Sequence, residues 1–340
     1  MEQSIHRGLT GSDTFLRQWF GDVPMNERML VTGQASYAAS GAKAGLSQWF
    51  NHESIHWSGF PVNPQREEVV KGLERYRARS IRRLVAVGGG SVIDMAKLFN
   101  HFRKKTAKSN AIPPLLAIPT TSGSGSEATH FAVCYQGPVK TSIADPSLRP
   151  DSALLIPEWT YSMTPYQTAC SGIDALAQGI ESHWAKGATA ASRQHSARAI
   201  TLALAHLEEA VLTPSPVHRA GMQEAAYAAG CAIDTAKTTA AHAYSYALTM
   251  QFGLPHGHAV ALLLPFFIDA HQRVGIQVPG VEGHEIRQLI QRIGLKSTVP
   301  APANDVFTLL REQVNQERLA NNPVPVADAW LVEIADTLTQ

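Results

Sequence analysis

The chain has 340 residues, of which 44% are hydrophobic and 17% are charged, a composition typical of a globular protein with room for two domains. Its formal net charge of +1 gives no reason to expect a nucleic acid or a membrane surface as a partner. No apolar run reaches the roughly 18 residues of a membrane-spanning helix, and the N-terminal MEQSIHRGLTGSDTF has no apolar signal core. The three cysteines, Cys134, Cys170 and Cys231, show no disulfide spacing and favour a reducing, cytoplasmic location.

The first half of the chain alternates predicted strands with predicted helices. Short apolar runs predict strands at residues 28–32, 54–59, 83–88 and 115–119, and helical patterns occur at 38–50 and 66–80. This alternation predicts a parallel, doubly wound sheet that binds its ligand at the carboxyl ends of the strands. From Thr168 onward the strand signals fade, so we expect an α/β domain over residues 1–160 and an all-helical domain over 161–340, with one helix opening after Gly172 and another over 304–320.

Two glycine-rich turns follow directly on the third and fourth predicted strands. The first is Gly88-Gly89-Gly90-Ser91, whose backbone N–H groups could approach a pyrophosphate at the start of the next helix. The second, PTTSGSGSE, begins at Pro119 and offers hydroxyl groups to ribose or phosphate. Each turn alone could be a plain connection or a linker. Two of them in this topology favour a dinucleotide.

Residues 234–265 in the second half contain two histidines, His242 and His256, separated by a Gly-Leu-Pro step. Proline fits the first turn of a helix but not its interior, so one helix should end and another begin between the two imidazoles. Each histidine would then lie near a helix end, where it could bind a metal. Upstream, Asp174 and Gln178 are spaced i and i+4 and share one helix face. A buried aspartate needs a cation or several donors.

The motifs GGGSVIDMAK and PTTSGSGSEAT, in this order and spacing, resemble the paired nucleotide signatures of the iron-containing (group III) alcohol dehydrogenases. The resemblance runs from about residue 29 to about residue 265. It implies a Rossmann-like α/β N-terminal domain plus an all-α C-terminal domain, the dehydroquinate synthase-like fold. It also implies a metal and a nicotinamide in the cleft between the two domains.

The resemblance further implies which residues contact the dinucleotide. They are Gly33, Ser36, Gly88, Gly89, Gly90, Ser91, Asp94, Thr120, Thr121, Ser126 and Lys140. Lys140 could instead be a solvated loop lysine. Members that prefer NAD often place an aspartate after the first strand, whereas this chain has Gln34 and Ser36 there. Because no carboxylate would repel a 2′-phosphate, we expect NADP(H) in preference to NAD(H).

The metal ligands of the family correspond here to Asp174, Gln178, His242 and His256. Gln178 stands where the family has a histidine. A glutamine carbonyl oxygen can bind a hard divalent ion, but it is a weaker donor than an imidazole. We therefore expect Fe²⁺ or Zn²⁺. The alternative is that the metal has been lost and these are buried polar groups.

Three further residues are candidates for catalysis or substrate binding. Tyr246 stands where many members have a second histidine near the nicotinamide, and Tyr246 or His258 could relay a proton or only pack. If Lys237 is buried, it needs an anionic partner. The partner could be a phosphonate, phosphate or carboxylate group of the substrate, bound together with Thr238, or a neighbouring residue such as Asp234. We assign Lys237 to both the catalytic and the substrate-binding residues.

The segments SGIDALAQGIES and AKTTAAHAYSYALTMQFGLPHGHAVALLLP resemble the phosphonoacetaldehyde reductase branch of the family. We therefore predict NAD(P)H-dependent reduction of a small anionic aldehyde, phosphonoacetaldehyde first among them, by a cytoplasmic homodimer that binds neither nucleic acid nor membrane. Alternatives are a metal-free enzyme resembling the maleylacetate reductases and a general small-alcohol dehydrogenase. A dehydroquinate synthase-like lyase and a non-catalytic nucleotide-binding protein are further alternatives.

Overall fold

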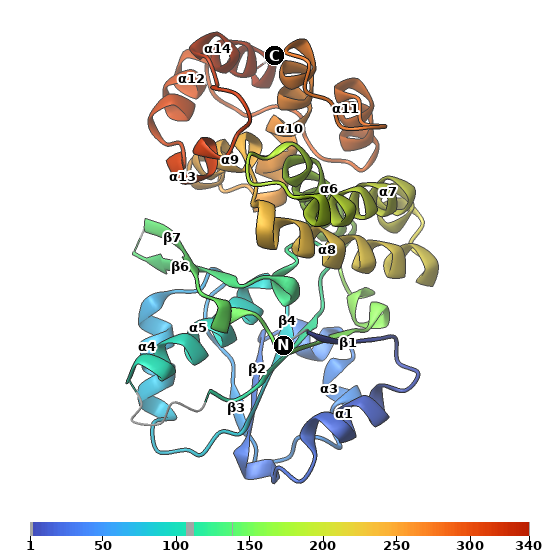
Figure 1. The fold of residues 1–340 in the computed structure, drawn as a ribbon, viewed down its shortest axis with the longest axis vertical. Coiled ribbons are helices and arrows are strands. Elements are labelled where there is room, and N and C mark those ends of the chain that lie inside the picture. Colours follow the sequence, from blue (N-terminus) through green and yellow to red (C-terminus); the bar gives the residue numbers. More distant parts are fainter. Residues whose placement is uncertain (1–2, 107–111, 138, 340) are drawn as a thin grey trace. The chain divides into compact units, whose positions relative to one another are not determined.

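The computed structural model describes residues 3–106, 112–137 and 139–339, and the chain divides into two compact units, Met1–Met163 and Thr164–Gln340. The first unit is an α/β unit and the second is built of helices (Figure 1). This architecture confirms the predicted fold class. In the part of the chain that is described, no helix is long and apolar enough to cross a membrane.

The α/β unit has one six-stranded parallel sheet, in the order β1-β8-β5-β4-β2-β3, and a separate antiparallel hairpin of β6 and β7. The sheet strands are β1 (Ser4–Arg7), β2 (Arg28–Thr32), β3 (Ile55–Trp57), β4 (Arg83–Gly88), β5 (Leu115–Pro119) and β8 (Ser152–Leu155). The hairpin strands are β6 (Phe131–Gln136) and β7 (Val139–Ala144). Its helices are α1 (Ser12–Phe20), α2 (Ser36–Ala39), α3 (Ala42–Gly45), α4 (Arg66–Arg75) and α5 (Gly90–Thr106). Short 3-10 helices are η1 (Met25–Glu27), η2 (Ser126–Ala128), η3 (Pro146–Leu148) and η4 (Pro157–Thr160).

Alternate strand residues point to opposite faces of the sheet, and both faces are buried because helices cover each of them. Met29 and Val31 of β2 belong to a core that includes residues of α4 and α5. Leu30 belongs to the opposite core, with Leu16 and Phe20 of α1. Figure 1 shows α4 and α5 on one side of the sheet and α1 and α3 on the other. All four strands predicted from the sequence are present in this sheet.

Several features of this unit differ from the sequence-based expectation: the strand β8 and the β6–β7 hairpin were not predicted, and α4 ends at Arg75 where a helix was predicted to residue 80. The sequence analysis predicted no strand at β1, whose residues SIHR form no apolar run; β1 exists because it pairs with β8, Ser4 opposite Ser152. The helix predicted over 38–50 is interrupted between α2 and α3. Gly41 has a φ of 84°, a left-handed conformation that ends one short helix before the next begins.

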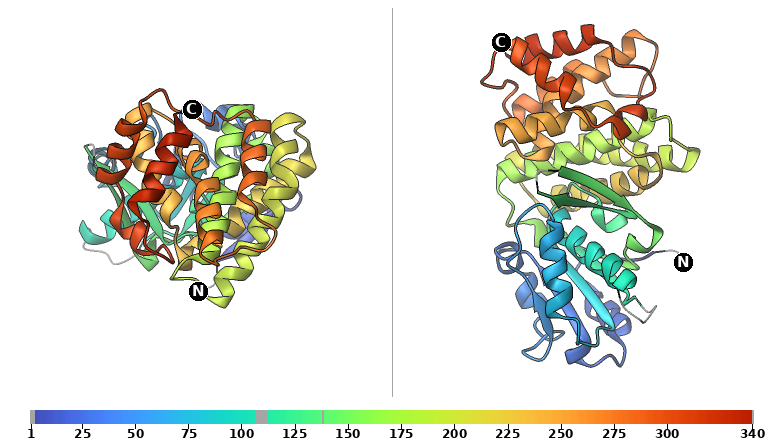
Figure 2. Two further views of the ribbon diagram at one scale, coloured as in Figure 1. Left: turned by 90° about the horizontal axis from the view of Figure 1, so that it is seen from above. Right: turned by 90° about the vertical axis from the view of Figure 1, so that its left-hand side faces the viewer.

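The helical unit contains nine described helices, which pack on one another as an all-α bundle (Figure 2). They are α6 (Pro165–Trp184), α7 (Ala190–Leu212), α8 (Pro216–Ala236), α9 (Ala240–Phe252), α10 (His256–Arg273), α11 (Gly283–Arg292), α12 (Ala303–Glu312), α13 (Gln316–Ala320) and α14 (Asp328–Leu338). Helices α6, α7 and α8 pack along one another, and α10 packs against both α6 and α9. The helix break predicted between His242 and His256 is confirmed. Gly253 ends α9 with a φ of 65°, and α10 begins directly after Pro255.

Two helix boundaries in this unit were not predicted. Helix α6 begins at Pro165, one turn or more before the start expected near Gly172, because Thr164 and Gln167 form a reciprocal capping box with the backbone. The helix expected over 304–320 is divided into α12 and α13. Asn315 begins α13 by accepting a hydrogen bond from the backbone N–H of Arg318 at 2.9 Å.

Candidate functional site

The α/β unit has a switch in strand order between β2 and β4. From β2 the chain runs outward to β3 and then returns to place β4 on the other side of β2. In open parallel sheets, ligands bind in the crevice beside such a switch, at the carboxyl ends of the strands. The turn 33–36 follows β2 at this position, and the turn 88–91 follows β4. Both turns were predicted to contact the dinucleotide.

The two glycine-rich turns predicted from the sequence lie in contact. Strands β4 and β5 are neighbours, and the Thr120 N–H donates to the Gly88 carbonyl at 3.0 Å. A Cβ atom added to Gly90 would lie 2.6 Å from Ser124 Oγ, and one added to Gly89 would lie 3.3 Å from Thr121. The absence of side chains at these positions therefore allows the second turn to pack against the first turn of α5.

Two hydroxyl groups of the second turn lack protein partners. Thr120 Oγ1 and Ser122 Oγ are buried, and neither makes a hydrogen bond to the described residues. An unsatisfied buried hydroxyl has an energetic cost, which a bound ligand would remove. Ser122 was not singled out in the sequence, although it belongs to the hydroxyl-rich run PTTSGSGSE. Together with the N-terminus of α5, these groups fit a ribose or a pyrophosphate.

Asp94 and Ser126, both predicted to contact the cofactor, bond to each other. Ser126 Oγ donates to one Asp94 oxygen at 2.5 Å, and the backbone N–H of Val133 donates to the other at 2.9 Å. Burial raises the pKa of Asp94, an effect that Lys97, 3.9 Å away, opposes. These contacts hold the second turn and strand β6 against α5. Direct contact of Asp94 or Ser126 with the cofactor stays a prediction.

Ser91 and Lys140 are also involved in local contacts. Ser91 Oγ accepts from the backbone N–H of Asn63 at 3.4 Å. Lys140, on β7, lies with its Nζ 5.9 Å from the ring centroid of Tyr135, its cross-strand partner. The predicted contacts of Ser91 and Lys140 with the cofactor, like those of Gly33 and Ser36, are not tested by these observations.

The helical unit brings together the aspartate and both histidines of the predicted metal site. One ligand atom from each of Asp174, His242 and His256 lies within 4.8 Å of the others. His242 Nε2 is 3.1 Å from Asp174 Oδ1, and His256 Nε2 is 3.9 Å from the same oxygen. Two imidazole nitrogens converging on one carboxylate oxygen match the donor set of Fe²⁺ or Zn²⁺ sites.

Gln178 lies beside these three residues, one turn after Asp174 on α6. Its Nε2 donates to Asp174 Oδ2 at 3.1 Å, while its buried Oε1 has no hydrogen-bond partner among the described residues. A carbonyl oxygen left unsatisfied beside a histidine and aspartate cluster fits a fourth ligand for a divalent cation. The four residues present are therefore chemically suited to hold the metal.

The charges around His242 depend on its two carboxylate neighbours. Burial alone would lower the pKa of His242, but Glu181 and Asp174 raise it to about 9. Burial alone would raise the pKa of Asp174, but His242 and His256 hold it below its usual value. A metal-binding histidine is the neutral imidazole, so a proton and a metal ion would compete for His242.

Glu181 is a site residue that the sequence analysis missed. Its Oε1 accepts hydrogen bonds from the backbone N–H groups of Thr239 and Ala241 at 3.2 and 2.8 Å, and so caps the N-terminus of α9 from a different helix. Its Oε2 pairs with His242 Nδ1. This pairing directs His242 Nε2 toward Asp174, the arrangement typical of a carboxylate behind a metal-binding histidine. The available signal was spacing: Asp174, Gln178 and Glu181 lie at i, i+4 and i+7 on α6.

Gly257 allows α10 to approach α6 closely enough for His256 to reach Asp174. A Cβ atom at this position would overlap the carbonyl oxygen of Cys170 and would lie 3.2 Å from Asp174 Cβ. The small residue between His256 and His258 is therefore required by packing.

Both ring nitrogens of His258, a predicted proton relay, are engaged. Its Nε2 is 2.9 Å from the Lys296 carbonyl oxygen, which can only accept, so Nε2 carries the hydrogen. Its Nδ1 then accepts from the Tyr166 hydroxyl at 2.9 Å. Tyr246, the other candidate, stacks on the metal-site residue His256 with ring centroids 6.0 Å apart and an interplanar angle of 26°.

Lys237 and Thr238, the predicted substrate-binding residues, lie in the connection between α8 and α9. Lys237 has a φ of 59°, which is uncommon for a residue other than glycine. Its half-exposed ammonium group pairs with Glu317 at 3.0 Å, not with Asp234 as considered from the sequence. Thr238 is buried, and its hydroxyl accepts from the guanidinium of Arg318. The role of either residue in substrate binding stays a prediction.

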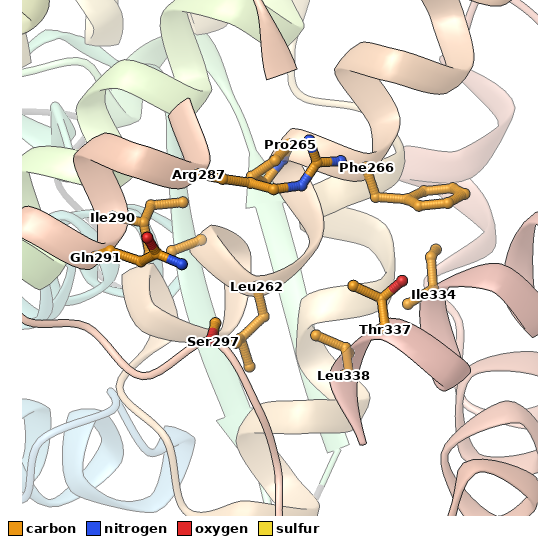
Figure 3. A pocket seen from close by; sticks show the side chains of 11 residues that line it. Leu262, Pro265, Phe266, Arg287, Ile290, Gln291, Ser297, Ile334, Thr337 and Leu338 are labelled. Atoms are coloured by element: carbon orange, nitrogen blue, oxygen red, sulfur yellow. The ribbon is translucent and has the colours of Figure 1, made fainter. Parts of the chain in front are cut away.

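A separate pocket of about 70 Å³ lies farther along α10, between α10, α11 and α14 (Figure 3). Leu262, Phe266, Ile290 and Ile334 give it an apolar lining, and Arg287, which also lines it, pairs with Asp269. Its α10 residue Pro265 is nine positions after His256, or about 13 Å along the helix axis. The pocket has room for a few water molecules and is not part of the metal site.

A parallel sheet with two glycine-rich turns, and a helical unit in which the buried Asp174 and His242 converge with the partly exposed His256, match the architecture of a dinucleotide- and metal-dependent oxidoreductase. The sequence-family model of the iron-containing alcohol dehydrogenases matches residues 14–157. The family model of the C-terminal region of Fe-containing alcohol dehydrogenases matches residues 168–336. Together they cover most of the chain. The chain belongs to the iron-containing alcohol dehydrogenase family, whose members are metal-dependent, NAD(P)-linked alcohol dehydrogenases.

Individual relatives are similar at moderate identity. A phosphonoacetaldehyde reductase of Streptomyces viridochromogenes is 35% identical over 59% of this chain and 56% of its own length. A long-chain-alcohol dehydrogenase of Geobacillus thermodenitrificans is 29% identical over 81% of this chain and 80% of its own length. The crystal structure of a sulfoacetaldehyde reductase from Bifidobacterium kashiwanohense with NAD+ has a TM-score of 0.85 at 28% identity, covering 99% of this chain and 97% of that one. The matched region therefore spans about half of the Streptomyces relative.

Proposed function

We propose that this protein reduces a small anionic aldehyde to the alcohol with NADP(H), and that phosphonoacetaldehyde, which would yield 2-hydroxyethylphosphonate, is its substrate. The observation that carries this proposal is the convergence of Asp174, His242 and His256, with the orphaned Gln178 oxygen beside them. Two similar proteins bear the names of reductases of anionic aldehydes, a phosphonate and a sulfonate. A cytoplasmic homodimer belongs to the same proposal.

A metal held by these residues would polarise the aldehyde carbonyl as a Lewis acid while a reduced nicotinamide supplies the hydride. The protein's own contribution is to position the donors. Glu181 orients His242 through Nδ1, and Gly257 lets His256 approach α6. Gln178 supplies a neutral amide oxygen in place of an imidazole, so we expect weaker metal retention than a three-histidine set would give.

The glycine-rich turns supply the proposed dinucleotide site. The N-terminus of α5 and the unsatisfied hydroxyls of Thr120 and Ser122 are suited to phosphate and ribose oxygens. The turn after β2 carries Gln34 and Ser36 and no carboxylate, which supports NADP(H) over NAD(H).

The proton for the product alkoxide is proposed to pass through Tyr246. Its stacking on His256 supports this assignment. His258 is the second candidate, but its Nε2–H donates to a backbone carbonyl and its Nδ1 accepts from Tyr166. A relay through His258 would first have to break one of these bonds.

The experiment that tests the proposal is NADPH oxidation by the purified protein, loaded with Fe²⁺ or Zn²⁺, on phosphonoacetaldehyde, succinic semialdehyde, lactaldehyde, maleylacetate and propanal. The highest kcat/KM is expected with phosphonoacetaldehyde, and chelation should abolish turnover. Full activity after chelation would indicate a metal-free enzyme of the maleylacetate reductase kind. Nucleotide binding without any oxidation would overturn the reductase proposal.

A further inference from the structure

Arg318 lies near the metal site although it comes from the C-terminal segment of the chain. Helix α13 packs against α9, the helix that carries His242 and Tyr246. Within α13, Asn315 holds the backbone N–H of Arg318, and the Arg318 side chain is half-buried. The fold thus places a guanidinium beside the helix that supplies a metal-site histidine.

Two contacts fix the direction of this guanidinium. Arg318 Nη1 donates to the hydroxyl of buried Thr238, and Arg318 Cζ lies 6.0 Å from the centroid of the Tyr246 ring. Tyr246 in turn stacks on His256, with centroids 6.0 Å apart. Only one aromatic ring therefore separates the Arg318 charge from a residue of the metal site.

Among the residues that the structure describes, no carboxylate balances the charge of Arg318. In the described ranges of the chain, no carboxylate oxygen lies within 4 Å of its side-chain nitrogens. The neighbouring Glu317 is engaged with Lys237 at 3.0 Å, an exposed pair in which each charge compensates the other. A guanidinium is always protonated, and its planar fork matches phosphonate, sulfonate and carboxylate groups. Arg318 is thus a cation near the metal site that retains donors for an external anion.

We propose that Arg318 is the specificity-determining residue of the substrate site and binds the anionic end of an aldehyde substrate. Thr238 and Tyr246 hold its guanidinium in place. This inference rests on the proposed function and deepens it, because it assigns the selection of anionic aldehydes to one side chain. Lys237, paired with Glu317, then contributes less than Arg318.

Arg318 could affect activity by a structural role in place of substrate binding, because the segment that contains Arg318 and Asn321 also holds the connection between α8 and α9. The experiment must distinguish these two roles. Asn321 Nδ2 donates to the carbonyl oxygens of Ala236 and Thr238 at 2.8 and 3.0 Å. Asn321→Ala therefore removes a clamp and leaves the charge unchanged. Arg311→Ala is the matched control for loss of an arginine, since Arg311 on α12 is exposed and lies 3.8 Å from Asp328.

The experiment measures kcat and KM of the metal-loaded, full-length protein with phosphonoacetaldehyde and with propanal. Loss of a charge-assisted, forked contact should raise KM for phosphonoacetaldehyde 10- to 100-fold in Arg318→Ala, which corresponds to roughly 1.4–2.7 kcal/mol of binding free energy. The KM for propanal should change less than threefold. Arg318→Lys keeps the charge without the fork and should be intermediate. Lys237→Ala should affect phosphonoacetaldehyde less than Arg318→Ala does. Asn321→Ala should change both substrates by similar factors, and Arg311→Ala neither.

A binding measurement supports the assay without turnover. Calorimetric titration with 2-hydroxyethylphosphonate should show at least tenfold weaker binding to Arg318→Ala than to the wild type. Equal effects on both aldehydes, or unchanged binding of 2-hydroxyethylphosphonate, would overturn the assignment. If Arg318→Ala unfolds or loses metal, the test uses Arg318→Lys, and the ratio of its KM change with phosphonoacetaldehyde to its KM change with propanal decides whether Arg318 binds the anion. If the wild-type protein oxidises NADPH with neither aldehyde, the proposed function itself is contradicted. If the wild type reduces both aldehydes and Arg318→Ala impairs both reactions equally, only the role of Arg318 is contradicted.

Discussion

The two units build their candidate sites from different materials. In the α/β unit the site consists of backbone groups and hydroxyls in the turns at the ends of β2, β4 and β5, and each turn is one short run of sequence. In the helical unit the site consists of side chains from three helices, and His242 follows Asp174 by 68 positions in the sequence. A site built from short turns depends on local conformation, whereas a site built from side chains of several helices depends on how those helices pack. Mutations should therefore separate nucleotide binding from metal binding.

The largest effect is expected from Asp174→Ala. Asp174 is the carboxylate on which both histidines converge, and its loss leaves two neutral donors and an amide oxygen. Metal affinity should fall more than 1000-fold and reductase activity with it, while NADPH binding stays within threefold of the wild type. Metal analysis after dialysis and NADPH fluorescence titration measure the two quantities. His284→Ala, an exposed histidine on α11, is the control.

Gly257→Ala should destabilise the helical unit strongly. The new Cβ atom would overlap the carbonyl oxygen of Cys170, a backbone atom that cannot move away alone. The cost should be about 3 kcal/mol or more in the free energy of unfolding, with loss of metal. Gly253→Ala, at a φ of 65° with nothing within 4 Å, should cost only about 1 kcal/mol. Similar melting temperatures for the two variants would contradict the packing role of Gly257.

Glu181→Gln should weaken the metal site without removing a ligand. The amide can still accept hydrogen bonds from the N-terminus of α9, but it cannot offer His242 a negative charge. Metal affinity should fall 10- to 100-fold, the usual effect of losing a carboxylate behind a metal-binding histidine. A competition titration with a chelating dye measures it. An affinity within twofold of the wild type would show that Glu181 only caps α9.

The smallest effect is expected from Gly90→Ala, which tests the other side of the comparison. Its Cβ atom would lie 2.6 Å from Ser124 Oγ and would push the second turn away from α5. NADPH affinity should fall about tenfold, since the turn moves by only a fraction of an ångström. Metal content should be unchanged. If metal binding fell together with nucleotide binding, the two sites would not be independent in the way that their construction implies.

Much of the fold was predictable because its signals are local. The four predicted strands, β5, β4, β2 and β3, are neighbours in the sheet, whereas β1 has no apolar run and depends on pairing with β8. Strand β8, which has four residues, was missed as well although it contains an apolar run. The break at Gly253–Pro255 follows from the two residue types alone. The division of the predicted 38–50 helix at Gly41 was missed, because the helical pattern continues across that glycine.

By itself, the sequence determined the nucleotide turns and the residue types of the metal site. These depend on backbone freedom and donor chemistry, which are properties of single residues and short motifs. Tertiary structure alone decided which side chains meet. Glu181 on α6 contacts His242 on α9, and Lys237 pairs with Glu317. Arg318, from the C-terminal segment, lies beside Tyr246. The physical reason is that such contacts are set by helix packing, and the packing depends on small residues such as Gly257 that carry no chemical signal of their own.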